Sequence, residues 1–134
     1  MNAYTVGLGC DRGVALATVR EAVAAALALA GASPEQVVVA ASITIKQDEA
    51  ALLAFAQEQG WPLAFYTPEQ LAQVTVPNPS ETVRKYTGTP SVSEAAALLA
   101  AGPDTLMTAL VVEKHKHRGA DGRNATVSIA RKDA

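Results

Sequence analysis

The sequence predicts a single three-layer α/β/α domain over residues 1–134, with a mixed sheet of about five strands and a C-terminal antiparallel hairpin. The length of 134 residues fits one domain and is short for two ordinary ones. Up to about residue 112, segments with the apolar spacing of strands alternate with segments that have the apolar spacing of helices. The last two apolar segments are joined by a turn without a helix between them, as in a hairpin.

Two strands and two helices are expected in the first 60 residues. Residues 3–8 form a short strand, and a helix of about fifteen residues follows the glycine-rich loop, because apolar residues recur at helical spacing up to a closing glycine. Residues 33–36, Ser-Pro-Glu-Gln, are a capping box that opens one helical turn, and the valine run after it favours a strand to Ile45. Asp48 is expected to cap a second helix, which ends at Gly60.

One strand and three helices follow. Residues 62–66 are expected to form the third strand. Residues 67–70, Thr-Pro-Glu-Gln, are a capping box at the start of a short helix, and Ser80 is expected to cap another short helix that Gly88 ends. Residues 91–94, Ser-Val-Ser-Glu, are a third capping box and open an Ala-rich helix. With 28 alanines in the chain, we expect helices that pack closely on the sheet.

The last two strands form the predicted hairpin. Residues 106–112 are apolar on both faces, which is typical of a central strand. In residues 125–130, the apolar Ala125, Val127 and Ile129 alternate with Thr, Ser and Ala, as in a half-buried strand. Asp121 and Gly122 between these segments are a turn signal.

Composition excludes several classes of protein. With one cysteine, the chain cannot form an internal disulfide framework or a Cys-rich zinc ribbon. It has no apolar run of about 18 residues and no signal-peptide pattern, so we expect a soluble, cytoplasmic protein that does not bind membranes. Aromatic residues make up only 4 %, and no nucleic-acid-binding motif is visible, which argues against a nucleic-acid partner.

Charge is distributed unevenly along the chain. Residues 1–113 carry five Lys or Arg and eleven Asp or Glu, whereas residues 114–134 carry six Lys or Arg, two Asp and both histidines. The net charge of −2 therefore hides a basic C-terminal stretch. Such a stretch suits an anionic ligand, and a solvated hairpin tip is the alternative.

The first candidate site is the glycine-rich loop between the first strand and the first helix. Glycines let the backbone approach a ligand, and the following helix presents free N–H groups, so this loop suits a phosphate or carboxylate. An ordinary turn between strand and helix is the alternative. The candidate ligand-binding residues are Gly7, Gly9, Cys10, Arg12 and Gly13. Cys10 is also a candidate nucleophile with a lowered pKa, or a small packing residue.

The second candidate site follows the second strand. Lys46 and Glu49 are three positions apart at a junction between strand and helix, where both side chains can face one cleft. Glu49 is the candidate general base or acid. A capped helix start with solvated charges is the alternative.

The third candidate site is the polar, turn-rich stretch 78–92, which lies between two predicted helix starts. Two helix N-termini close together favour oxyanions, and Asn78 and Ser80 are the candidate ligand-binding residues. The alternative is a connector in which the hydroxyl groups only cap helices.

The fourth candidate site is the basic stretch 114–118. In an extended chain, Lys114, Lys116 and Arg118 share one face, and His115 and His117 share the other. Lys114 and Lys116 are candidate ligands for a polycarboxylate. Two histidines without a clear third ligand are weak evidence for a metal, so we predict neither a metal site nor a cofactor.

These segments together resemble a known family. Residues 7–13 (Gly-Leu-Gly-Cys-Asp-Arg-Gly), the stretch 78–96 and the final strand 127–131 after a Lys-x-Lys pair are similar to the C-terminal domain of CbiG from cobalamin biosynthesis. The family also includes CobE, a free-standing protein of this length. The resemblance spans nearly the whole chain. At Asp11, the family pattern leads us to expect a basic residue.

The resemblance implies a role in corrin-ring synthesis, and three functions follow. The first is an accessory or carrier protein that binds a precorrin or corrinoid through its carboxylates. The second is a cobalt-precorrin-5A hydrolase, which opens the ring-A lactone with release of acetaldehyde; here Glu49 would be the base, with Lys46 or Arg12 stabilising the oxyanion. The third is an interaction module for a neighbouring precorrin methyltransferase or another enzyme of the pathway. The oligomeric state is left open.

Overall fold

A five-stranded mixed sheet forms the centre of the protein. The computed structural model describes residues 2–132, and the order of the strands is β3-β2-β1-β5-β4. The strands span β1 (Ala3–Cys10), β2 (Val37–Ile43), β3 (Leu63–Tyr66), β4 (Leu110–Arg118) and β5 (Asn124–Lys132). The first three strands are parallel, and β5 runs antiparallel to both β1 and β4. The predicted mixed sheet and C-terminal hairpin are therefore confirmed.

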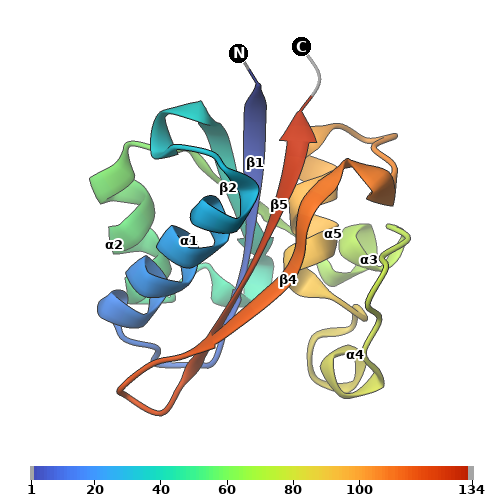
Figure 1. The fold of residues 1–134 in the computed structure, drawn as a ribbon. Coiled ribbons are helices and arrows are strands. Elements are labelled where there is room, and N and C mark those ends of the chain that lie inside the picture. The colour runs from blue at the N-terminus through green and yellow to red at the C-terminus, as the bar shows by residue number, and fades with distance from the viewer. Residues whose placement is uncertain (1, 133–134) are drawn as a thin grey trace.

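Helices cover both faces of this sheet, which confirms the three-layer arrangement. The helices span α1 (Leu16–Ala30), α2 (Ala50–Gln59), α3 (Pro68–Ala72), α4 (Glu81–Thr87) and α5 (Val92–Ala101). In Figure 1, α1 and α2 lie on one side of the sheet, and α5 lies on the other side with α3 beside it. The start of β1 and the end of β5 lie side by side at one end of the central strands, and α4 lies toward the opposite strand ends (Figure 1). Of the described helices, none has the length and apolar character needed to span a membrane.

A glycine in β1 allows α5 to pack closely on the sheet. A Cβ atom added at Gly7 would lie 1.9 Å from the carbonyl oxygen of Ser93 and 2.7 Å from the backbone nitrogen of Ala97. The alanines at 95–97 of α5 are fully buried against the sheet. The hydroxyl of Thr5 also donates a hydrogen bond to the carbonyl of Ala97 at 2.6 Å. Small side chains on both partners thus fix the position of the α5 N-terminus.

The hairpin is attached to α1 by a cap from outside the helix. Ala15 occupies the N-cap position and has no side chain that can accept a hydrogen bond. Asp121 in the β4–β5 turn accepts instead, from the Ala15 backbone N–H at 2.8 Å and from the Thr18 hydroxyl at 2.9 Å. The hydrogen bond from Ala15 lowers the pKa of the Asp121 carboxyl below its usual value. The predicted turn at Asp121 is therefore correct, and the residue is a helix cap as well.

The sequence predicted the wrong strand as central. Residues 106–112 were expected to lie in the middle of the sheet, but β4 begins only at Leu110 and is an edge strand. Met107–Ala109 form a 3₁₀ turn, and Leu106 is 73 % exposed. The strand buried on both faces is β5, in which residues 127–130 are all buried. The small residues between the large ones in β5 allow α5 to cover its second face.

Two predicted caps and one strand end also need correction. The second helix begins after Glu49, and Asp48 pairs with Arg12 instead of capping it. At the start of α5, Ser91 is the N-cap residue but makes no side-chain cap hydrogen bond. β2 ends at Ile43 because residues 44–46 turn into a 3₁₀ helix. The capping boxes at 33–36 and 67–70 and the Ser80 cap are confirmed.

Candidate ligand-binding cleft

A cleft of about 650 Å³ lies at the carboxyl end of β1 and β2, next to α4 and the start of α5. This is the position at which open α/β sheets bind ligands, and the volume is in the usual range for organic ligands. The lining residues come from six parts of the chain: Gly9, Cys10, Asp11, Arg12, Ile43, Ile45, Lys46, Ser80, Thr82, Val83, Tyr86, Thr87, Ser91, Val92, Ser93, Lys114, Lys116, Asn124 and Thr126.

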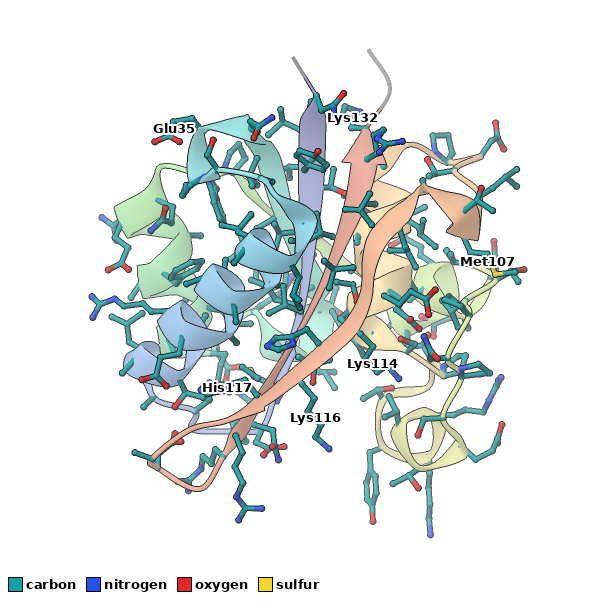
Figure 2. All side chains as sticks on the ribbon, viewed as in Figure 1. Glu35, Met107, Lys114, Lys116, His117 and Lys132 are labelled. Carbon is teal, nitrogen blue, oxygen red and sulfur yellow. The ribbon has the colours of Figure 1, made fainter. Side chains whose placement is uncertain are left out.

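The cleft is cationic in a protein whose net charge is negative. Arg12, Lys46, Lys114 and Lys116 line it, and among residues 2–132 Asp11 is the only acidic residue in the lining. Alternation along β4 places Lys114 and Lys116 on the same side, as the sequence predicts. Figure 2 shows both lysines on the side of β4 toward α4. The predicted third member of that basic face, Arg118, does not line the cleft.

Lys114 is held in place through Asn78. Its Nζ donates a hydrogen bond to the backbone carbonyl of Asn78 at 2.9 Å. The Nδ2 of Asn78 donates in turn to Glu94 at 2.7 Å and to Glu113 at 2.9 Å. Glu94 is fully buried in the first turn of α5. Asn78 does not line the cleft, so the structure places it as a support for Lys114 and leaves direct ligand contact as a prediction.

The glycine-rich loop contributes only part of its predicted residues to the cleft. Gly9, Cys10 and Arg12 line it, whereas Gly7 lies beneath α5. Gly13 has a φ of +78°, which favours glycine, and its N–H donates to both carboxylate oxygens of Glu49 at 3.3 and 3.2 Å. This N–H is therefore occupied within the protein.

Ion pairs link this loop to the residues after β2. Arg12 pairs with Asp48 at 2.8 Å and with Glu49 at 3.3 Å, and it donates to the carbonyl of Ile45 at 2.6 Å. The Nζ of Lys46 lies 4.0 Å from Glu49. Lys46 lines the cleft, but Glu49 is 4 % exposed and lies outside the lining. The structure brings the predicted catalytic pair together and places only Lys46 at the cleft surface.

Cys10 does not have the lowered pKa expected of a nucleophile. Burial raises the pKa of its thiol to about 11, against a smaller opposing effect of Lys46. Cys10 is the last residue of β1, and α1 begins only at Leu16, so Cys10 does not lie at the N-terminus of α1 as the loop sequence suggested. The thiol is therefore protonated at neutral pH.

Asp11 supports the sheet at the rim of the cleft. Its carboxylate accepts from the backbone N–H of Asn124 at 2.7 Å and from the Asn124 side chain at 3.1 Å. Asp11 thus extends the pairing of β1 with β5 beyond Cys10. This contact explains why an acidic residue stands where the family pattern suggests a basic one.

Two lining residues lie in the predicted stretch 78–92 but were not named there as ligand-binding residues. Tyr86 is 75 % exposed and lies on the cleft wall formed by α4. Ser91, at the start of α5, also lines the cleft and is 1 % exposed. The predicted ligand-binding residue Ser80 lines the cleft, and its hydroxyl accepts a hydrogen bond from the Val83 N–H at 3.2 Å. The sequence signal that could have identified Tyr86 was an aromatic residue in the last turn of a short polar helix.

The two histidines lie away from the cleft. The Nε2 of His117 is 2.9 Å from Glu21 of α1, on the other side of β4 (Figure 2). Neither His115 nor His117 lines the cleft. Within residues 2–132, no group of three or more His, Cys, Asp or Glu side chains is arranged to hold a metal ion.

The fold and the cleft define a three-layer α/β domain with a cationic site at the carboxyl end of its parallel strands. The family described as "Cobalamin synthesis G C-terminus" matches residues 4–130. The chain therefore belongs to this family, the CbiG C-terminal and CobE family of cobalamin biosynthesis, as its sequence motifs predict.

Two relatives extend this comparison. The cobalt-precorrin-5A hydrolase of Priestia megaterium is 38 % identical over 125 residues, which cover 93 % of this chain and 31 % of the hydrolase. Protein CobE of a Sinorhizobium species is 40 % identical over 111 residues, which cover 81 % of this chain and 70 % of CobE. The chain thus spans less than a third of the hydrolase it matches.

Solved structures share the fold. The crystal structure of CobE, a protein from the cobalamin (vitamin B12) biosynthetic pathway, has a TM-score of 0.76 and 30 % identity, and covers 97 % of this chain and 90 % of its own. The cobalamin biosynthesis protein chiG of Agrobacterium tumefaciens has a TM-score of 0.64 and 27 % identity, and covers 94 % of this chain and 97 % of its own.

Proposed function

We propose that this chain binds a precorrin or corrinoid intermediate through its carboxylates, as an accessory or carrier protein of cobalamin biosynthesis. The observation that carries this proposal is the cleft with four basic side chains, one acidic side chain and a partly apolar wall. Family membership supports the choice of pathway, and the side chains that line the cleft support the choice of a ligand with carboxylates.

The composition of the cleft matches the two parts of such a ligand. A corrinoid acid is a large apolar macrocycle with carboxylates around its edge. The apolar wall comes from Ile43, Ile45, Val83, Val92 and the exposed ring of Tyr86. Lysines and arginines pair with carboxylates through charge-assisted hydrogen bonds. A ligand that lies with its ring against the apolar wall would place carboxylates near the basic side chains.

Lys114 and Lys116 lie on one strand and are suited to such pairing. Lys114 already has a fixed position through Asn78. Within the described chain, Lys116 forms no ion pair or side-chain hydrogen bond, so its ammonium is available to a ligand. A prearranged cation loses less conformational freedom on binding than a mobile one.

A visible-absorbance titration with hydrogenobyrinic acid tests this proposal. Replacing both lysines (Lys114→Ala with Lys116→Ala) should weaken binding by about 10- to 100-fold, as expected for the loss of charged contacts of about 1.5–3 kcal/mol. The matched control is Lys85→Ala with Arg118→Ala, which removes the same charge from exposed positions outside the cleft. Equal weakening in both double variants would contradict recognition by Lys114 and Lys116.

Hydrolysis is the second candidate function, because the hydrolase of Priestia megaterium is similar over 93 % of this chain. Lys46 at the cleft and Glu49 beside it are the proposed catalytic pair. Product analysis after incubation with a precorrin that carries the ring-A lactone tests this function. Release of acetaldehyde from the lactone substrate by the wild type, with loss in Glu49→Gln, would favour the enzyme. A stable complex with a pathway methyltransferase and no affinity for free tetrapyrrole would favour the interaction module.

A further inference from the structure

The first turn of α5 has unoccupied hydrogen-bond donors at the cleft wall. No side chain caps this helix. Within residues 2–132, the backbone N–H groups of residues 92–94 have no acceptor, and the first helical bond is donated by Ala95 to the Ser91 carbonyl at 3.2 Å. Free N–H groups at a helix start carry partial positive charge and attract anions.

A second, independent feature marks the same position. Ser91 lines the cleft and is 1 % exposed, and its hydroxyl has no hydrogen-bond partner among the described residues. Burial of a hydroxyl without a partner costs free energy, so such groups need an explanation in a native fold. A ligand oxygen at this wall would supply the missing acceptor.

Lys114 provides a full positive charge next to this turn. Its ammonium binds the backbone of Asn78, and Asn78 binds the carboxylate of Glu94 in the same first turn of α5. On the other side, the hydroxyl of Ser128 bonds both to Ser93 and to the Glu113 carbonyl, which ties β4 to α5 at this level. Glu94 does not line the cleft, because its oxygens are taken up by Asn78.

We infer that the N-terminus of α5 is a subsite for one carboxylate group of the ligand, bound by the Ser91 hydroxyl and the free N–H groups of the first turn, with Lys114 neutralising its charge. That this carboxylate belongs to a corrinoid rests on the proposed function. The subsite itself requires only that the ligand has a carboxylate group.

The Ser91→Ala variant separates a ligand contact from a structural cap. Because the hydroxyl has no partner in the free protein, its removal should leave the melting temperature unchanged or raise it. The same change should weaken binding of hydrogenobyrinic acid about 10-fold in the absorbance titration. Thr67→Ala is the matched control: Thr67 caps α3 through a 3.1 Å bond from the Gln70 N–H, outside the cleft. It should lower the melting temperature by about 3–5 °C and leave binding unchanged.

A small probe tests the subsite without the corrinoid. Propionate, added to the ¹⁵N-labelled wild-type protein, should shift the amide signals of residues 92–94 in a saturable way, and these shifts should weaken in Ser91→Ala. Tight corrinoid binding by Ser91→Ala, or a lowered melting temperature of this variant, would overturn the subsite and leave the proposed function intact. Failure of the wild type to bind the corrinoid, with the propionate shifts present, would overturn the proposed function alone. Absence of those shifts overturns the subsite in either case.

Discussion

At the scale of single residues, Asn78 shows how an uncharged side chain organises charged neighbours. Its Nδ2 donates to the carboxylates of Glu94 and Glu113, and the backbone carbonyl of Asn78 accepts from Lys114. An aspartate at position 78 would bring a third negative charge to the two carboxylates and would provide no donor. The side-chain amide therefore satisfies the buried carboxylate of Glu94 as a donor, while the backbone carbonyl of the same residue holds the cleft lysine.

Asp121 carries a prediction about stability and pH. Its carboxylate caps α1, and the Ala15 N–H lowers its pKa in the folded state. A lowered folded pKa means that the ionised group stabilises the fold above the pKa of the unfolded chain, about 3.9, and that this contribution is lost as the pH falls through the folded pKa. Asp121→Asn should therefore lower the melting temperature at pH 7, and the difference from wild type should shrink below about pH 3.9.

The matched control for this prediction is Asp104→Asn. Asp104 is exposed and has no hydrogen bond among the described residues, yet the substitution changes the net charge by the same amount. Thermal melts of the three proteins from pH 7 to pH 2.5 make the comparison. If the two variants behave alike across this range, the effect is one of net charge, and the capping role of Asp121 is wrong.

At the scale of elements, the contact of α5 with β1 determines where the cleft wall lies. Gly7→Ala would place a Cβ 1.9 Å from the Ser93 carbonyl, so α5 must move away from the sheet. We expect a loss of about 1–3 kcal/mol in the free energy of unfolding, as for other overpacked cores. Urea unfolding measures this loss.

Gly9 on the same strand is the internal control. A Cβ at this position meets its nearest atoms at 3.9 Å, in Val92, which is an ordinary contact. Gly9→Ala should therefore change the free energy of unfolding by less than about 1 kcal/mol. Equal losses at the two positions would mean that the close approach of α5 to Gly7 does not determine the packing.

The elements that the sequence predicted well are those with a local cause. Glycines at 31, 60 and 88 end helices in left-handed conformation, and the capping boxes at 33–36 and 67–70 form as expected. The errors arise where a hydrogen-bond partner distant in the sequence determines the local structure. Asp121 caps α1 from the hairpin turn. The carboxylate of Glu94 accepts a hydrogen bond from Asn78 and does not form the predicted capping box with Ser91. Periodicity alone does not show which strand of a hairpin pairs with β1, so β4 rather than β5 was placed at the centre.

At the scale of the whole molecule, the topology explains how much of the site was predictable. Residues 9–12, 43–46 and 114–116 meet because the parallel strands end at the same edge, where β4 also crosses. Basic residues and glycines mark these segments in the sequence. Ser91 lies within the predicted stretch 78–92 but was not singled out as a ligand-binding residue, because a serine at a helix start normally serves as a cap. Only the folded protein shows that its hydroxyl is unpaired.

The charge distribution of the molecule leads to the last prediction. The protein has a net charge of −2, while its cleft has four basic side chains and one acidic side chain. A polycarboxylate is therefore drawn to the cleft and repelled by the remaining surface, and added salt screens this attraction over distances greater than about 10 Å at 0.1 M. Raising NaCl from about 50 to 500 mM should weaken hydrogenobyrinic acid binding about 10-fold.

Two comparisons show whether this salt effect comes from the cleft. The double variant Lys114→Ala with Lys116→Ala should have a flatter dependence of affinity on salt, because fewer cations contribute. A corrinoid whose carboxylates are converted to amides should bind with an affinity that hardly changes with salt. If the acid binds equally well at both salt concentrations, the apolar wall around Ile43 and Tyr86 provides the binding energy, and the basic side chains are not the recognition element.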